Sequence, residues 1–357
     1  MLMIGADLMP PLAGLFVLDF STLLPGPMTS MMLAEAGAEV LKIEPPQGDD
    51  MRRFPPVVDG ESAAFAALNH GKSILSLDLK SAGAVAALRS HLERADILIE
   101  QFRPGVMARL GLGYEAVRAI NPGIIYCSIT GYGQTGPRAM EAGHDLNYIA
   151  RTGMLGLSSG GATHPVMPPL LAADIAGGTF PAVINILLAL RQRDRTGEGS
   201  HLDIAMADTP ATFLWHAAAT RAATGAVPRD GAELFTGGSP RYRTYAAADG
   251  RLIAVGALEE KFWQAFCTAI ALPEAFRGAD ATPREAIAAV AERLVARPSD
   301  HWRTVFEPLD CCVCVVATLD EAMAEPQFIQ RGLFQAGAGK DGSVSRAFVP
   351  VVPQFRR

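Results

Sequence analysis

The chain has 357 residues, of which 49% are hydrophobic and 19% are charged, and its formal net charge is −6. This length and apolar content suffice for one large or two medium domains with a sizeable buried core. The negative charge and the lack of a lysine- or arginine-rich run argue against sequence-independent nucleic-acid binding. No unbroken apolar run reaches the roughly 18 residues of a membrane helix, and the N-terminus lacks the basic start of a signal peptide. We therefore expect no membrane association and a cytoplasmic location.

The first 190 residues alternate short apolar runs with helical stretches. Strands are expected at residues 15–20, 39–43, 73–79, 95–100 and 124–129. Helices are expected at residues 29–38, 83–94 and 179–191, the last of which is the longest and most apolar. Because strands that alternate with helices favour parallel pairing, the sequence predicts an α/β fold, with a large Rossmann-like parallel-sheet domain over residues 1–200.

A smaller α+β domain is expected at residues 241–329, after a linker at residues 201–240 that is rich in alanine, glycine and threonine. The dipeptide Asp249-Gly250 between two apolar runs predicts a hairpin. Two helices and a cysteine-rich strand follow it. The cysteines of that strand, Cys311, Cys312 and Cys314, have no second ligand pair at zinc spacing. We therefore expect a buried strand with reduced thiols and no metal.

Residues 131–136 fit the pattern Gly-x-Gly-x-x-Gly that binds dinucleotides after a strand. The context does not support that function, because Pro137 follows at once, no helix opens there, and the expected acidic residue is missing. The glycines more simply let the backbone approach a ligand or turn the chain. The chain also has no Gly-x-Ser-x-Gly elbow and no His-Glu-x-x-His motif, so serine and zinc hydrolysis lack an anchor.

His144 and Asp145 are adjacent, and Asp174 follows 30 residues after His144. Imidazole titrates near neutral pH, and burial can lift the pKa of a carboxylate toward the same range. Two such groups on opposite faces of one carbon could remove a proton from one side and return it on the other, as in a racemase or epimerase. The alternative is structural: His-Asp pairs are often at the surface, and Asp174 and Glu259 could each cap a helix. Glu259 could instead orient a histidine.

The sequence resembles alpha-methylacyl-CoA racemases, members of the family III CoA-transferase superfamily, almost from end to end. The matching segments lie at residues 41–46, 76–80, 103–106, 129–137, 142–155, 254–259 and 331–334. Within the superfamily, the racemases have counterparts of His144, Asp174 and the supporting Glu259, together with Tyr242 and Arg109. The transferases resemble this chain at Asp145, where the resemblance implies an acyl-accepting aspartate.

The resemblance also implies an interlocked homodimer, in which Glu259 reaches His144 from the other subunit. CoA would lie on the large domain, which the C-terminal tail at residues 330–357 would complete. Its phosphates would lie on cations such as Lys42, Lys80 or Arg103. The acyl-CoA thioester is the substrate, so no further cofactor is implied. Two positions depart from the racemase pattern: Leu170 replaces an asparagine and Pro45 an arginine.

Three functions follow from these residues. The first is epimerisation of the α-carbon of a 2-methylacyl-CoA-type thioester, with His144 and Asp174 exchanging protons through an enolate. The second is CoA transfer between carboxylic acids through a covalent intermediate at Asp145. The third is a CoA-binding scaffold without activity, which has no need of the His144, Asp174 and Glu259 set.

Overall fold

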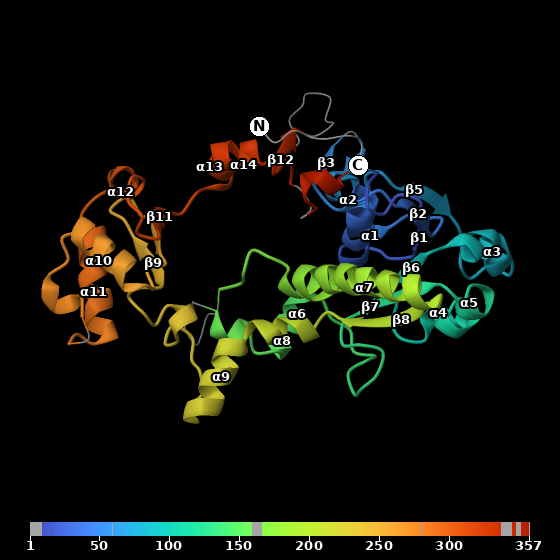
Figure 1. Cartoon of the computed structure of the whole chain (residues 1–357), viewed down its shortest axis with the longest axis horizontal. Coiled ribbons are helices and arrows are strands. Elements are labelled where there is room, and N and C mark those ends of the chain that lie inside the picture. The colour runs from blue at the N-terminus through green and yellow to red at the C-terminus, as the bar shows by residue number, and fades with distance from the viewer. Residues whose placement is uncertain are drawn as a thin grey trace. The chain divides into compact units, whose positions relative to one another are not determined.

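A computed structural model describes residues 9–58, 60–158, 166–278, 280–336, 345–347 and 351–356 of the chain. The chain divides into two compact units, which we describe separately (Figure 1). The large unit comprises residues 1–152, 170–213 and 335–357, and the small unit comprises residues 153–169 and 214–334.

A six-stranded parallel sheet forms the centre of the large unit, in the order β5-β2-β1-β6-β7-β8. The strands are β1 (Phe16–Asp19), β2 (Glu39–Glu44), β5 (Ser73–Ser76), β6 (Ile97–Glu100), β7 (Ile125–Thr130) and β8 (Ser200–Ala205). Every residue of β1, β6 and β7 is buried, as expected for central strands that helices cover on both faces. The predicted α/β fold with a parallel sheet is confirmed. The sixth strand, β8, lies in a segment where we expected a linker.

Helices cover both faces of this sheet (Figure 1). On one face, α3 (Ala84–Arg94) and α5 (Tyr114–Ile120) bury Leu88, Leu92 and Val117 in a shared core with β1 and β7. On the other, α1 (Pro25–Glu35) lies against α7 (Phe180–Thr196), which contacts β7 and β8. A π-helix at Ala172–Thr179 runs directly into α7.

The π-helix and α7 together form a helical stretch, Ala172–Thr196, that is long and apolar enough to cross a membrane. It is the one such stretch that the described residues contain. Polar residues such as Asp174 and Asn185 interrupt this stretch, so it is not an unbroken apolar run, and 44% of its apolar 18-residue window is buried inside the fold. The helix buries Ala182, Ile186 and Ala189 within the unit, as a helix of an α/β layer does.

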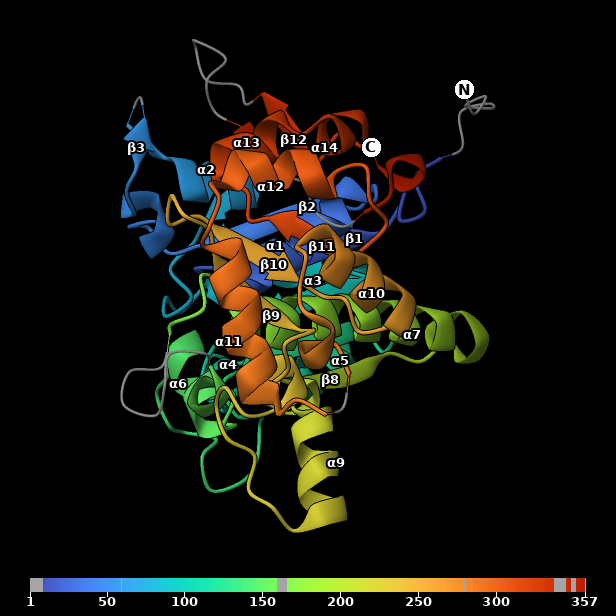
Figure 2. The same cartoon turned by 90° about the vertical axis from the view of Figure 1, so that its left-hand side faces the viewer.

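The small unit holds a three-stranded antiparallel sheet in the order β11-β10-β9 (Figure 2). Its strands are β9 (Arg243–Ala246), β10 (Leu252–Val255) and β11 (Val313–Val315). Three helices, α10 (Glu260–Ala269), α11 (Pro283–Leu294) and α12 (Ser299–Phe306), share one core with it. The predicted hairpin at Gly250 is present, with the glycine at φ 81°. The strand predicted to be buried is partly exposed: Cys312 and Cys314 are exposed, whereas Cys311 and Val315 are buried in the core.

The remaining elements are short. They are β3 (Val57–Val58), β4 (Glu61–Ser62), α2 (Ala63–Asn69), α4 (Val106–Arg109), α6 (Asp145–Arg151), α8 (Asp208–Phe213), α9 (Trp215–Thr224), α13 (Leu319–Ala324), α14 (Pro326–Gln330), β12 (Phe334–Ala336) and β13 (Ser345–Ala347).

The strand order defines where a ligand fits in the large unit. From β1 the chain proceeds outward to β2 and β5 on one side, and then crosses to β6, β7 and β8 on the other. The connections that leave β1 and β6 therefore diverge. In open α/β sheets, ligands bind in the crevice at the carboxyl ends of the strands at this reversal.

Candidate active site

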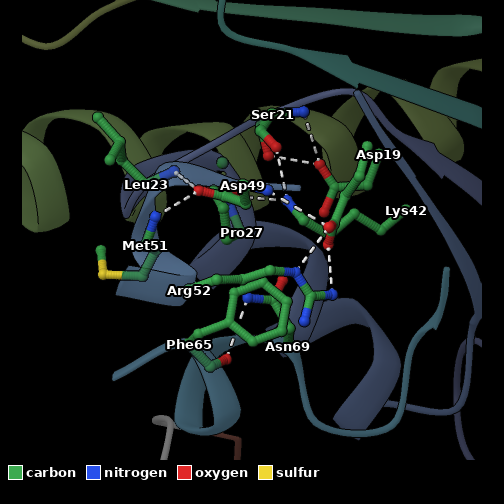
Figure 3. Close-up of polar contacts among 12 residues, drawn as sticks. Asp19, Ser21, Leu23, Pro27, Lys42, Asp49, Met51, Arg52, Phe65 and Asn69 are labelled. Carbon is green, nitrogen blue, oxygen red and sulfur yellow. Dashed lines mark hydrogen bonds and ion pairs between the residues drawn. The ribbon is translucent and has the colours of Figure 1, made fainter. Parts of the chain in front are cut away.

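The turn after β1 is fixed by a cluster of buried charges (Figure 3). Asp19, the last residue of β1, accepts hydrogen bonds from Ser21 and Ser30 and lies 3.2 Å from the Lys72 ammonium. Burial opposes the ionisation of Asp19, but Lys72, Lys42 and the serine hydroxyls outweigh it and lower the pKa to about 2. Asp19 is therefore a permanent anion that holds the chain in place.

Lys42 belongs to the same cluster, and its side chain has no exposed surface. Its ammonium lies 3.0 Å from Asp49 and donates a 2.6 Å hydrogen bond to the Ser21 carbonyl. Asp49 in turn accepts the backbone N–H of Leu23 and of Met51. We expected Lys42 to bind a CoA phosphate, but the structure places it inside the fold, where it fixes the turn after β1.

Beside this turn lies a cavity of about 460 Å³ at the carboxyl ends of β1, β6 and β7. The turn after β1 and the loop after β6 form two of its walls, and the backbone N–H of Gly26 joins them by a 3.0 Å hydrogen bond to the side chain of Gln101. The cavity thus occupies the crevice that the strand order predicts. Its other lining residues include Phe102, Arg103, Pro104, Ile129, Gly131, His144, Asn147, Tyr148, Asp174 and Met206.

His144 lines the cavity at the start of α6. It occupies the N-cap position, where its backbone N–H donates a 3.0 Å hydrogen bond to the Asn147 side chain. Its side chain is exposed. The helix start therefore fixes the backbone of His144, and the imidazole faces the cavity at the crevice.

Asp145, the next residue, is turned into the fold and is 5% exposed. One carboxylate oxygen accepts the backbone N–H groups of Ala173 and Asp174, at 2.6 and 3.0 Å. Among the described residues, those that line the cavity do not include Asp145. Its geometry is that of an anchor for the π-helix, and it does not favour the predicted role as an acyl acceptor.

Asp174 lies in the π-helix and lines the same cavity as His144. Burial raises its pKa to about 6, the negative charge of Asp145 adds to the rise, and His144 opposes it. Asp174 is within the helix, whereas Leu171 occupies the N-cap position, so the capping interpretation does not hold. π-helical turns are frequent at functional sites because they displace a side chain from the regular helical position.

Glycines allow close packing at the π-helix that carries Asp174 and next to Tyr148. A Cβ at Gly177 would lie 2.2 Å from the Met206 carbonyl oxygen. The π-helix can therefore approach the turn after β8 this closely only because residue 177 is a glycine. A Cβ at Gly131 would lie 2.6 Å from the Tyr148 hydroxyl. The glycine-rich motif at residues 131–136 thus accommodates a buried tyrosine beside the cavity.

The other predicted site residues are distributed over both units. Arg103 lines the cavity, whereas Lys80 and Arg109 are exposed residues of the large unit that the described lining does not include. Tyr242 and Glu259 belong to the small unit. Glu259 is exposed at the start of α10, and its side chain makes no capping bond to the described backbone.

Sequence reasoning missed Gln101 and Tyr148. Gln101 joins the two walls of the cavity, and Tyr148 is a buried group whose hydroxyl donates a 2.6 Å hydrogen bond to the Gly143 carbonyl. Burial, together with nearby Asp174, raises the pKa of Tyr148 to about 12, so it stays a donor. Gln101 lies directly after a predicted strand, and Tyr148 lies in the first turn of α6. These positions were the signals that could have found them.

A histidine and a protonatable aspartate in a cavity at the reversal point of a parallel α/β sheet are able to support acid–base or acyl-transfer chemistry. The profile of the family described as "CoA-transferase family III" matches residues 12–355. The chain belongs to this family and is an enzyme of its superfamily.

Relatives with both activities resemble the chain. Alpha-methylacyl-CoA racemase of Homo sapiens is 33% identical over 97% of this chain and 89% of its own length. Acetyl-CoA:oxalate CoA-transferase of Acetobacter aceti is 34% identical over 92% of this chain and 86% of its own length. The crystal structure of a CAIB/BAIF family protein from Brucella suis superposes with a TM-score of 0.83 at 30% identity, covering 96% of this chain and 93% of the other. A CoA thioester as substrate fits this family.

Proposed function

We propose that the protein is an acyl-CoA racemase or epimerase that moves a proton at the carbon next to the thioester carbonyl. The observation that carries the proposal is that His144 and Asp174 line one cavity and that the pKa of Asp174 is raised to about 6. A carboxyl with that pKa is populated in both protonation states near neutral pH. It can therefore act as acid in one direction and as base in the other.

The thioester carbonyl acidifies the adjacent C–H bond, so that removal of the proton gives an enolate. In one direction neutral His144 takes the proton from one face, and protonated Asp174 delivers another to the opposite face. In the reverse direction ionised Asp174 takes the proton and the imidazolium returns one. Asp145 holds the backbone of Asp174 through its N–H, and so positions the second proton carrier. The resemblance to racemases favours 2-methylacyl-CoA-type substrates, and Arg103 is the basic side chain among the described residues that line the cavity.

The proposal includes an interlocked homodimer. On α7, Ile184 and Leu188 lie one turn apart and are 56% and 63% exposed, so the large unit presents an apolar stripe. A second copy is the partner whose Glu259 would support His144. Mixing inactive His144→Ala and Glu259→Ala subunits tests this directly. Random re-pairing should restore about a quarter of wild-type activity, because half the dimers then contain one intact site. No recovery would contradict a shared site.

Exchange of the α-proton tests the function. The protein is incubated with (2R)- or (2S)-2-methylacyl-CoA in D₂O without an acceptor acid, and deuterium at C2 is followed by NMR. We expect exchange and interconversion of the two epimers. In His144→Ala, interconversion of the two epimers should stop while CoA binding persists; unchanged interconversion would remove His144 from the mechanism.

CoA transfer is the second candidate, because transferases match the chain as well as racemases do. Its acyl acceptor would be Asp174, whose carboxylate faces the cavity, in place of the buried Asp145. The Asp174 carboxylate would attack the thioester carbonyl, release CoA thiolate and leave a mixed anhydride. Acyl-CoA plus oxalate or succinate should then yield the acceptor's CoA thioester, and His144→Ala should retain this activity. That result, without α-proton exchange, would replace the first proposal.

A further inference from the structure

Next to the loop after β6, three polar side chains connect neighbouring strands of the sheet. Glu100 ends β6, Ser128 is its register partner in β7, and His201 lies in β8. We infer that Glu100, Ser128 and His201 form a hydrogen-bonded relay that positions the cavity loop at residues 101–104. Through this relay, the proton arrangement at His201 is coupled to binding of the CoA ligand. The coupling to CoA rests on the proposed function, whereas the positioning of the loop does not.

The contacts of the relay are continuous. The Glu100 carboxylate is 4% exposed, accepts the backbone N–H of Phe102 at 2.8 Å and is hydrogen-bonded by Ser128. The Ser128 hydroxyl lies 3.0 Å from Nε2 of His201. The imidazole stacks on Tyr114 at 4.9 Å between ring centres and meets Tyr126 edge-on at 5.3 Å. His201 is exposed, so the relay runs from the loop after β6 to solvent.

The single proton of the Ser128 hydroxyl links the two ends. When Glu100 is ionised, Ser128 donates to it and accepts from the Nε2–H of His201. When Glu100 is protonated, it can donate to Ser128, which then donates to an unprotonated Nε2. Both arrangements satisfy the hydrogen bonds between the three side chains. They differ by one proton that Glu100 takes up from solvent and by the tautomer of neutral His201, which carries its proton on Nε2 in the first and on Nδ1 in the second.

The pKa of Glu100 lies near neutral pH, where both arrangements are populated. Burial raises its pKa to about 7, although the hydrogen bonds from Ser128 and Phe102 oppose the rise. The titratable groups of β7 that its charge affects are Tyr126 and Cys127, whose pKa values it helps to raise. His201 faces Asp203 and Glu115, which oppose the lowering of its pKa by burial. No basic side chain among the described residues stabilises the Glu100 anion.

Ionisation of Glu100 changes how firmly the loop is held. The Phe102 N–H donates to a full negative charge only when Glu100 is ionised, and charge-assisted hydrogen bonds are about twice as strong as neutral ones. The same loop carries Arg103 into the cavity and ties Gln101 to the turn after β1. The loop is therefore ordered above pH 7 and loosened below it, and CoA should bind more tightly at the higher pH.

Two measurements test the relay on the full-length protein from pH 5.5 to 8.5. The first is hydrogen exchange at the amides of residues 101–103 without ligand, corrected for intrinsic rates. The second is calorimetric titration with free CoA. In the wild type, protection should fall and the Kd for CoA should rise about fivefold as the pH drops through 7. Glu100→Gln should show flat profiles at the low-pH values, since glutamine resembles the protonated acid.

Three further variants complete the design. Ser128→Ala should move the midpoint to higher pH, because the anion loses a donor. His201→Ala should move it in the same direction, by less. Glu93→Gln, an exposed carboxylate of α3, is the matched control and should leave both profiles unchanged. Identical pH profiles in wild type and Glu100→Gln would overturn the relay. Normal exchange profiles without CoA binding at any pH would leave the loop positioning intact and overturn the coupling together with the proposed function.

Discussion

Asp19 and Asp174 are aspartates near the same end of the large unit's sheet, yet their pKa values move in opposite directions. Asp19 is fully buried beside Lys72 and Lys42, and its pKa falls to about 2. Asp174 is less buried, yet burial raises its pKa to about 6, because no lysine among the described residues opposes the rise and the anion of Asp145 adds to it. The sign of the neighbouring charge, more than the depth of burial, therefore separates a structural carboxylate from one that can exchange protons.

The largest expected effect concerns the proton carrier. Asp174→Asn should lower kcat for interconversion of the two epimers by about 10³-fold, since it removes one of two general acid–base groups. The appearance of the opposite epimer measures this loss, and circular dichroism should show an unchanged fold. Asp194→Asn, an exposed aspartate of α7, serves as control. Retention of more than a tenth of the activity would mean that Asp174 is not a proton carrier.

The complementary change is Asp19→Asn, which should lower the free energy of unfolding by about 3 kcal/mol, because it leaves the Lys72 ammonium buried without its anion. Urea denaturation measures this loss. The stabilisation by Asp19 is present above its unfolded pKa near 3.8 and is lost as the pH falls toward 2. A variant as stable as the wild type would show that the buried charges do not hold the turn after β1.

A smaller effect distinguishes the cations. Arg103→Ala should raise KM for the acyl-CoA about fivefold with little change in stability, since Arg103 lines the cavity. Lys42→Met should leave KM unchanged but destabilise the protein, because Asp49 then remains buried without its cation. Steady-state kinetics and thermal melts of both variants decide the matter. A higher KM for Lys42→Met at full stability would restore it as a phosphate ligand.

The smallest expected effect is a gain in stability. Folding disfavours the ionised form of Asp174, and this lowers the free energy of unfolding. The loss is absent below pH 3.8, grows between pH 3.8 and 6, and is complete above pH 6. Asp174→Asn should therefore be more stable than the wild type at pH 8, by roughly 1 kcal/mol after allowance for solvent screening, and equal to it at pH 4. Denaturation at the two pH values tests the sign. Equal stabilities at pH 8 would mean that the site carries no such penalty.

Local patterns in the sequence were enough for the fold class. The alternation of apolar runs and helices predicted five of the sheet's strands and its parallel pairing, because residue periodicity is a property of neighbouring residues. They failed at β8, an edge strand whose exposed positions His201 and Asp203 break the apolar run. They also failed at the π-helix, whose geometry depends on packing of Gly177 against a distant carbonyl.

For the site, the sequence by itself named His144 and Asp174, the two proton carriers that we propose, because their chemistry belongs to the residue types and to a family pattern. Only the tertiary structure decided which charged side chains are accessible to a ligand in the cavity. It placed Lys42 inside the fold beside Asp49, turned Asp145 toward the backbone of the π-helix, and left Asp174 facing the cavity. The physical reason is that a charge is defined by its partners and its solvation, and both come from segments far apart in the chain.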